Sequence, residues 1–297
     1  MNPREAGFLL LTSHLGDPHR HPLTPAQMRT LANRVAAMEK PETDRELETA
    51  DLIQLGYGRE MAARIVALLS QEDVLTNYLQ LGRRSGCVPV SLAGELYPSR
   101  IRKVLGFEAL GCLWAKGDLS ILDTPMIAVV GSRDLEPLNG RFAAAVGAEA
   151  ARQGYTLVSG NARGADRIAQ NACLNNGGRV ISIVADELEK QPDHPRILWL
   201  SEDGYGEEFS AQRALSRNRS IHALAEKTFV AQCTEGKGGT WDGTVKNLRF
   251  GWSPVFAFDD GSHAMALLRN MGAELIGMEE LGDLSSLQGY DRSFLEE

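Results

Sequence analysis

Four clusters of small, cationic and hydroxyl-bearing residues stand out in the second half of the chain. They are Gly131-Ser132-Arg133, residues 159–166, Arg213 with Arg217-Asn218-Arg219, and residues 236–240. Glycine lets a ligand approach the backbone, hydroxyl and amide groups bind oxygen atoms, and an arginine fork pairs with a phosphate. Each cluster alone would also suit an ordinary turn or a solvated surface. Together they indicate a site for negatively charged groups.

The first two clusters each follow a predicted strand. Gly131, Ser132 and Arg133 come after the apolar run 126–130, and Ser159, Gly160, Arg163, Gly164 and Asp166 come after the run 155–158. Small residues between a strand and a helix leave backbone N–H groups free to face an anion at the helix N-terminus. Asp166 would lie in the first helical turn, where a carboxylate complements the helix dipole or accepts hydrogen bonds from a base or a ribose. Both interpretations stay open.

The third cluster falls within one predicted helix, residues 211–225. Arg213 and Arg217 are one helical turn apart and therefore share a face, whereas Asn218 points to another side and is followed by Arg219. A solvated cationic helix surface is the simpler explanation. The position of the cluster after a predicted strand at 197–200 favours contact with a phosphate backbone.

The fourth cluster is a glycine-rich turn between a predicted strand at 228–232 and a helix. It consists of Gly236, Lys237, Gly238, Gly239 and Thr240, and Thr240 is the predicted N-cap of the helix. The turn lacks the spacing of a phosphate-binding P-loop, and the chain has no G-x-G-x-x-G dinucleotide fingerprint. It therefore predicts a second anion cradle without indicating ATP hydrolysis of the P-loop type.

The elements that must position these clusters alternate between strand and helix. Strands are predicted at 126–130, 155–158, 180–184, 197–200, 228–232, 255–258 and 274–276, with helices at 139–153, 165–175, 211–225, 240–250 and 262–271. The strands are continuous apolar runs, as expected when helices cover both faces of a sheet. This pattern predicts an α/β fold with a Rossmann-like, doubly wound, mostly parallel sheet. Ligands of such sheets bind at the carboxyl ends of the strands, where all four clusters fall.

The chain divides into four predicted regions. Residues 1–85 form a small helical domain of helix-hairpin-helix or similar type, in which Thr24-Pro25 begins a helix that ends near Met38. Residues 86–125 are rich in glycine and proline and form a connecting extension with short strands. Residues 126–277 form the Rossmann-like core. Residues 278–297 form an acidic tail that we expect to be loosely held.

Composition narrows the class of protein. The chain has 297 residues, of which 43% are hydrophobic and 24% charged, as in ordinary globular proteins. The net charge of −8 is concentrated at the end, because residues 262–297 carry two basic and seven acidic side chains. A local cationic patch is therefore compatible with the acidic total. No apolar run approaches the ~20 residues needed to cross a bilayer, and no secretory signal is visible, so we expect a cytoplasmic protein.

Other chemistry is weakly indicated. The four cysteines, Cys87, Cys112, Cys173 and Cys233, lack a CxxC pair and are predicted to be small buried residues. His14, His19 and His21 lack an evident partner ligand, and no nucleophile accompanies the carboxylates of Glu235 and Asp242. We therefore expect no catalytic residue, no metal and no cofactor.

The clusters, taken in order, resemble the DprA/Smf (DNA processing protein A) family. The resemblance rests on Ile127–Gly131 with Ser132-Arg133, Ser159-Gly160…Arg163-Gly164…Asp166…Ala169, Arg217-Asn218-Arg219…Ile221, a glycine-rich turn, and the preceding Tyr97-Pro98 and Leu113–Gly117. It covers residues 95–260. The family often has histidine after the alanine at position 169, where this chain has Gln170, and its glycine-rich turn differs from Gly238-Gly239-Thr240.

The resemblance implies a protein that binds single-stranded DNA, forms a homodimer and assists loading of the RecA recombinase in recombination and natural transformation. It implies phosphate contacts by Arg133, Arg163, Arg217 and Arg219. It also implies a pocket shaped by Ser159, Gly160, Gly164, Gly238, Gly239 and Thr240. The alternative is a Rossmann-like enzyme or sensor, similar to the phosphoribohydrolases, acting on a nucleotide-derived small molecule. The Gly-Gly-Thr turn followed by Asp242 favours that alternative.

Overall fold

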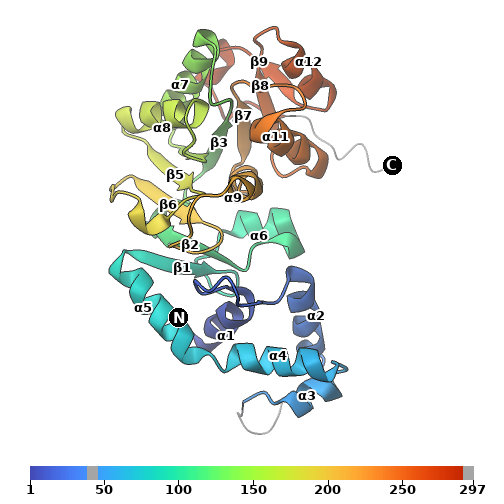
Figure 1. The fold of residues 1–297 in the computed structure, drawn as a ribbon. Coiled ribbons are helices and arrows are strands. Elements are labelled where there is room, and N and C mark those ends of the chain that lie inside the picture. The colour runs from blue at the N-terminus through green and yellow to red at the C-terminus, as the bar shows by residue number, and fades with distance from the viewer. Residues whose placement is uncertain (39–45, 290–297) are drawn as a thin grey trace.

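A nine-stranded sheet forms the centre of the molecule in the order β1-β2-β6-β5-β4-β3-β7-β8-β9 (Figure 1). The computed structural model describes residues 1–38 and 46–289. The strands are β1 (Cys87–Ser91), β2 (Cys112–Lys116), β3 (Met126–Val130), β4 (Thr156–Ser159), β5 (Arg179–Ile183), β6 (Ile197–Ser201), β7 (Lys227–Val230), β8 (Val255–Phe258) and β9 (Glu274–Ile276). Along the stretch of the sheet from β6 through β5, β4, β3, β7 and β8 to β9, neighbouring strands are parallel. Strand β2 is antiparallel to both of its neighbours, β1 and β6. The predicted mostly parallel, Rossmann-like sheet is confirmed.

Helices cover both faces of this sheet. The helices of the sheet region are α6 (Ser99–Leu105), α7 (Pro137–Arg152), α8 (Ala165–Asn175), α9 (Ala211–Ser216), α10 (Asn218–Leu224), α11 (Gly238–Phe250) and α12 (His263–Asn270). The buried side chains of β3 alternate between the faces, with Ile127 and Val129 packing toward α7 and α8 and Ala128 packing toward α10 and α12. This two-sided burial is the reason for the continuous apolar strands.

Helices α7 and α8 lie against each other at close range. A Cβ atom at Gly147 would overlap the backbone of Ala169, and one at Gly178 would lie 2.5 Å from the sulfur of Cys173. Glycine and alanine therefore set how near the two helices can come. Their position fixes the start of α8, which lies beside the end of β3.

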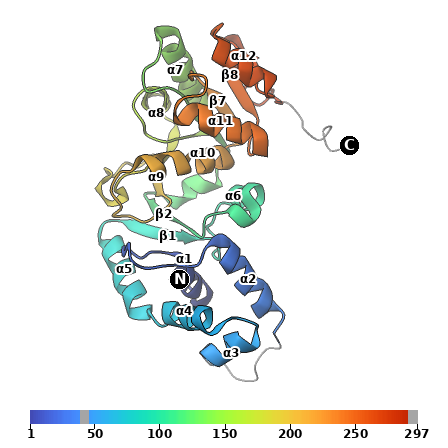
Figure 2. The same ribbon diagram turned by 45° about the vertical axis from the view of Figure 1, so that its right-hand side comes forward.

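The N-terminal residues form helices, as predicted. They are α1 (Pro3–Thr12), α2 (Pro25–Ala36), α3 (Thr49–Gln54), α4 (Arg59–Leu69) and α5 (Glu72–Arg84). Leu11, Leu31, Leu52 and Ile65 share a cluster of their own. Figures 1 and 2 show these helices gathered at one end of the molecule, with α11 and α12 near the other.

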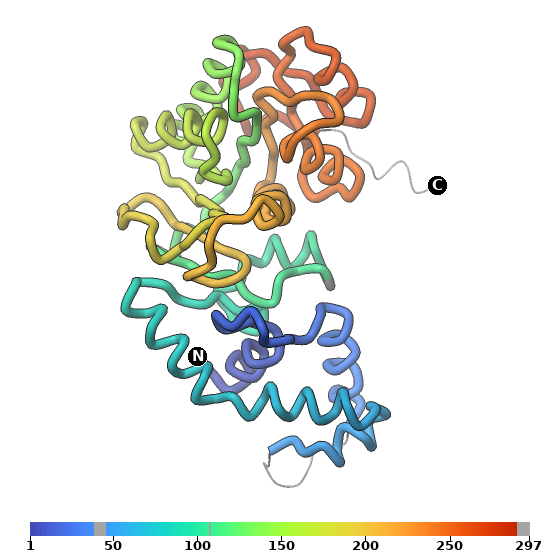
Figure 3. Tube along the Cα trace, viewed as in Figure 1, coloured from blue at the N-terminus to red at the C-terminus, as the bar shows by residue number. Residues whose placement is uncertain are grey.

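An aromatic cluster attaches the N-terminal helices to the sheet. The Tyr78 ring of α5 stacks on Tyr205 with centroids 4.4 Å apart, and the Trp114 ring of β2 meets Tyr78 edge-on at 5.1 Å. The Tyr205 hydroxyl donates to the Tyr78 carbonyl. Residues 86–125, expected to connect two regions, thus supply β1 and β2 to the same sheet and receive α5. The trace in Figure 3 shows this passage from α5 into β1.

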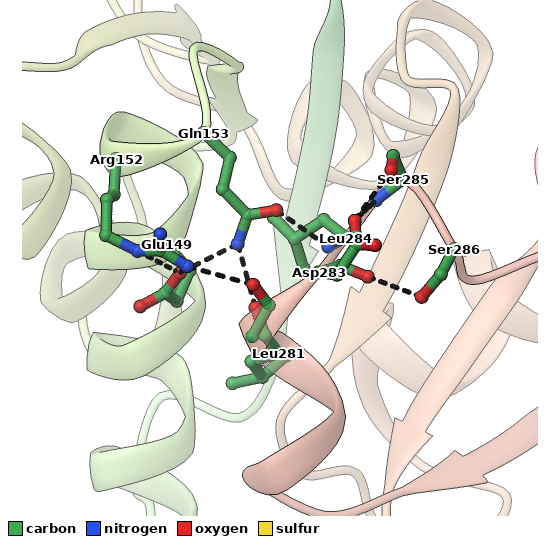
Figure 4. A network of polar contacts seen from close by, with 9 residues as sticks. Glu149, Arg152, Gln153, Leu281, Asp283, Leu284, Ser285 and Ser286 are labelled. Atoms are coloured by element: carbon green, nitrogen blue, oxygen red, sulfur yellow. Dashed lines mark hydrogen bonds and ion pairs between the residues drawn. The ribbon is translucent and has the colours of Figure 1, made fainter.

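Residues 278–289 pack firmly, contrary to the expectation of a loosely held tail. Leu281, Leu284 and Leu287 are buried in the core on the side of α7. Polar contacts reinforce this packing, because Gln153 binds the backbone of both Leu281 and Leu284 (Figure 4). The acidic composition of this segment did not reveal that its three leucines are spaced so that all of them face the same side of it. Residues 290–297 of the predicted tail lie outside the described residues.

Two further expectations concern side-chain chemistry and membranes. All four cysteines are free and buried, as predicted. In the described part of the chain, no helix combines the length and apolar character that a bilayer crossing requires.

Candidate nucleic-acid interface

A cavity of about 520 Å³ lies at the carboxyl ends of β3 and β7. Strands β4 to β6 lie on one side of β3 and β7 to β9 on the other, so the strand order reverses here. Such switch points are where open α/β sheets bind ligands. The lining includes ten predicted site residues, namely Gly131, Ser132, Arg133, Asp166, Arg217, Asn218, Lys237, Gly238, Gly239 and Thr240. We call this cavity the switch-point pocket.

The end of β3 forms one wall of the pocket. The Ser132 amide donates to the Gln232 carbonyl at 2.9 Å, which joins the turn after β3 to the residues after β7. A Cβ atom at Gly131 would lie 2.5 Å from that of Ala165 at the start of α8. Glycine is therefore needed where β3 meets α8.

The loop after β4 also depends on a glycine. Gly164 has φ +90°, and a Cβ atom there would lie 2.5 Å from the Arg133 carbonyl oxygen. Its neighbour Ala165 donates its amide to the Ser132 carbonyl at 3.2 Å. The loops after β3 and β4 are thus pressed together, backbone against backbone, and glycine at position 164 permits this close packing.

A buried carboxylate and a buried guanidinium lie below these loops. Asp166 accepts hydrogen bonds from the amides of Gly160 at 3.0 Å and Ala162 at 3.2 Å. Arg217 donates through Nη1 to the carbonyl oxygens of Gly160 and Ile183. Burial raises the pKa of Asp166 and lowers that of Arg217, and each charge opposes the shift of the other.

Two cations remain directed to solvent at the pocket. Arg133 and Lys237 are exposed, and both line the cavity. Lys237 is the N-cap residue of α11 and directly precedes the amides of the first helical turn. Amides at a helix N-terminus attract anions. A cationic entrance therefore surrounds a turn whose N–H groups are available.

The glycine-rich turn is held in place by two side chains. The Asn218 amide donates to the Gly239 carbonyl at 2.9 Å, and the Thr240 hydroxyl donates to the Gly131 carbonyl at 2.9 Å. The predicted role of Thr240 as N-cap was wrong, because α11 begins two residues earlier at Gly238. Thr240 instead joins α11 to the end of β3.

The predicted helix 211–225 is divided. Arg217 lies between the two helices, as the C-cap of α9 and the N-cap of α10. The side chain of Arg213 reaches the loop after β5, where it donates to the Ala185 carbonyl at 3.0 Å. It also pairs with Asp203 at 2.8 Å and binds the carbonyls of Glu207 and Glu208. Arg213 therefore holds the loop after β6 rather than lining the switch-point pocket.

The remaining predicted residues also lie off the pocket lining. Ser159 is fully buried, and its hydroxyl accepts from Gln170, which also donates to Ser182. Arg163 pairs with Asp134 at 2.7 Å in an exposed contact, a type of pair worth little. Arg219 lines a different cavity. Gln170 thus joins β4 to β5 at the position where the resembled family often has histidine.

Sequence reasoning missed several pocket residues. His222 and Thr234 line the pocket. His222 is buried in hydrogen-bonding range of Thr228 and Asn247, and burial lowers its pKa to about 3. His222 follows Asn218 by one helical turn. Residues at this spacing share a helix face, so the spacing could have identified His222 as a pocket residue from the sequence. His222 brings no positive charge to the pocket at neutral pH.

The carboxylates considered for acid–base chemistry are engaged elsewhere. Asp242 pairs with Lys246 at 2.8 Å, and Glu235 pairs with His263 at 3.0 Å. Neither lines the switch-point pocket. Over residues 1–38 and 46–289, no group of three or more His, Cys, Asp or Glu side chains is arranged to hold a metal ion.

The order of the strands in the sheet and the cavity at its switch point are those of a Rossmann-like protein. The family model of DNA recombination-mediator protein A matches residues 90–276, and the chain belongs to that family. The resemblance stated from sequence is thereby confirmed. DNA processing protein DprA of Streptococcus pneumoniae is 30% identical over 161 residues, which cover 50% of this chain and 55% of that protein. The chain thus spans about half the length of this curated relative.

Solved structures show the same fold. The crystal structure of DprA from Streptococcus pneumoniae matches 98% of this chain and 100% of its own, with a TM-score of 0.74 at 24% identity. A structure of DNA processing protein A from Helicobacter pylori, concerned with its single-stranded DNA binding mode, covers 65% of this chain and 93% of its own, with a TM-score of 0.54 at 21% identity.

Proposed function

We propose that this DNA-processing protein binds single-stranded DNA at the switch-point pocket. The observation that carries the proposal is the placement of Arg133, Lys237 and the start of α11 around one cavity. Two exposed cations and a set of helix N-terminal amides suit the phosphates of a flexible strand. Family membership and the DNA binding described for the Helicobacter pylori relative support the same conclusion.

The pocket favours phosphates and splayed bases over an aromatic stacking platform. Its lining contains no Phe, Tyr or Trp among the described residues. Its volume of about 520 Å³ is that of a small-ligand site. Arg133 and Lys237 hold the phosphate chain outside, while Gly239 and Asn218 bound the interior.

The family also suggests partners. We infer that the chain acts as a homodimer and assists RecA loading on single strands during recombination and natural transformation. This role would place the protein in the cytoplasm. Chemical cross-linking with RecA in the presence of single strands checks the partner, and sedimentation checks the dimer. Absence of a RecA complex under conditions where the strand is bound contradicts the loading role.

Anisotropy of a labelled oligothymidylate of about 20 nucleotides tests DNA binding. The double variant Arg133→Gln with Lys237→Gln removes two exposed cations at the pocket. We expect its affinity to fall at least about tenfold at about 50 mM salt, and its slope of log K against log salt to weaken by about 1.4. The reason is the loss of two phosphate contacts at about 0.7 each.

The matched control removes two arginines far from the pocket. Arg179 begins β5 at the amino edge of the sheet, and Arg269 lies in the last turn of α12. The variant Arg179→Gln with Arg269→Gln changes net charge equally. Equal loss of affinity in both double variants would show that overall charge, and not the pocket, governs binding. Binding of nucleoside monophosphates without binding of the oligonucleotide would favour the small-nucleotide alternative.

A further inference from the structure

A second and larger cavity lies between the N-terminal helices and the sheet. It has a volume of about 720 Å³ and is lined by residues of α1 and α2, Gly106, residues 108–112, Trp114 and, from the sheet region, Glu202, Asp203 and Arg219. Among the described residues, its lining shares none with the switch-point pocket. Small-molecule sites have volumes of roughly 300–1,000 Å³ and often lie between parts of a protein. We call it the inter-region cavity.

Arg219 contributes a half-buried guanidinium to the lining of this cavity. Its Nε is buried and has no hydrogen-bond partner among the described residues. A buried donor left unsatisfied costs free energy, so native proteins seldom retain one without a reason. The adjacent residue Asn218 lines the switch-point pocket. The two residues at the start of α10 therefore serve different cavities.

The neighbouring charges are already engaged. The carboxylate of Glu202 accepts hydrogen bonds from the hydroxyls of Ser216 and Ser220, and Asp203 pairs with Arg213 at 2.8 Å. Arg64 donates to the carbonyls of His21 and Pro22. Arg219 lies near the Glu202 carboxylate and favours its charged form, while its own Nε has no hydrogen-bond acceptor among the described residues.

The rest of the wall is largely hydrocarbon. Phe8, Met28 and Leu110 line it. A ligand must therefore combine an apolar body with an anionic oxygen. Glu108, Glu202 and Asp203 line the same cavity and repel a doubly charged phosphate more strongly than a singly charged carboxylate.

We propose that the inter-region cavity binds a small aromatic or aliphatic carboxylate, which pairs with the Arg219 guanidinium while its hydrocarbon packs against Phe8, Met28 and Leu110. A carboxylate can accept N–H groups from both Nη atoms of this guanidinium in a bidentate contact. The proposal is independent of DNA binding, because the two cavities have separate linings.

Calorimetric titration with 2-naphthoate tests the proposal on the full chain. The probe carries one carboxylate on a flat hydrocarbon, and 2-naphthol and 2-naphthyl phosphate are its neutral and dianionic counterparts. We expect 2-naphthoate to bind more tightly than both. Arg219→Gln should weaken 2-naphthoate by about tenfold or more, since a charge-assisted contact is lost, whereas the control Arg179→Gln should leave it unchanged.

A second variant narrows the cavity without altering Arg219. Ala32 is exposed on α2 and lines the cavity, so Ala32→Trp should block 2-naphthoate while oligothymidylate binding persists. The proposal is overturned if 2-naphthoate does not bind at up to about 1 mM, if Arg219→Gln or Ala32→Trp binds it as the unmodified chain does, or if the phosphate binds more tightly. Loss of oligonucleotide binding in Arg133→Gln with Lys237→Gln, but retained 2-naphthoate binding, would support two separate sites.

Discussion

The Arg217 guanidinium donates a hydrogen bond to the carbonyl oxygen of Gly160, 57 residues earlier in the chain. The same nitrogen reaches the Ile183 carbonyl at the end of β5. A Cβ atom at position 160 would lie 2.5 Å from the guanidinium Nη2. Glycine and arginine at these two positions are therefore matched, and their contact ties the loop after β4 to the start of α10. The pocket depends on this contact for its shape.

Replacing Arg217 should act mainly through stability. Arg217→Ala leaves two buried carbonyls and the Asp166 carboxylate without their cation, and such breaks cost about 3–5 kcal/mol. Arg217→Lys should not restore the loss, because one ammonium cannot reproduce the planar fork. Urea unfolding of both variants measures the change in unfolding free energy. An unchanged unfolding free energy with lost DNA binding would instead make Arg217 a direct phosphate contact.

Two glycine variants separate the effect of the close contacts at Gly164 from the effect of its positive φ. Gly164→Ala combines a positive φ with a Cβ atom pressed on the Arg133 carbonyl, so we expect a loss of roughly 2 kcal/mol or more, with weaker oligonucleotide binding. Gly154 has φ +80° and open space around it. Gly154→Ala should therefore cost only about 1 kcal/mol and leave binding intact. Equal effects in both variants would refute the close approach of the two loops.

Strand–helix alternation was predictable because each central strand is buried on both faces. Residues 126–130 and 274–276 match β3 and β9 in full. The glycine-bearing turns at the strand ends were also recognisable, since only small residues fit where loops approach one another. The sequence did not reveal that β1 and β2 join the sheet, because their place depends on Tyr78, Trp114 and Tyr205 meeting across the fold.

The roles of individual arginines were harder to predict. Arg217, Asn218 and Arg219 are consecutive, yet they serve a buried hydrogen-bond network, the switch-point pocket and the inter-region cavity. The break between α9 and α10 determines where each of these three side chains points, and no clear residue pattern in the sequence indicates that break. The hydroxyl of Thr240 likewise bonds across the sheet to Gly131, a contact that local patterns cannot show.

His222 should make the protein sensitive to acid. Burial lowers its pKa to about 3, against about 6.5 in an unfolded chain. Between these values the unfolded state binds a proton that the folded state excludes, so stability is full above pH 6.5 and declines as pH falls toward 3. The contribution lost between pH 6.5 and pH 5 is about 2 kcal/mol.

Urea unfolding of the unmodified chain and of His222→Gln at the two pH values measures that contribution. The variant should show a decline smaller by about 2 kcal/mol. An identical decline in both proteins would mean that other groups account for the acid sensitivity.

The segment after β9 should contribute to global stability. The side chain of Leu284 is fully buried, and Leu284→Ala should lower the unfolding free energy by about 2–4 kcal/mol. Ser286 lies two residues away and is exposed, so Ser286→Ala should change the unfolding free energy little. Thermal unfolding followed by calorimetry compares the two. A neutral Leu284→Ala would show that residues 278–289 do not belong to the cooperative core.

Hydrogen–deuterium exchange with and without oligothymidylate tests the central claim most directly, because it locates the bound strand. The account predicts protection of residues 131–134 and 234–240, the turns after β3 and β7 that border the switch-point pocket, and no change in the α2 and 106–111 segments of the inter-region cavity. Protection confined to the N-terminal helices, with both turns exchanging as in the free protein, would contradict it.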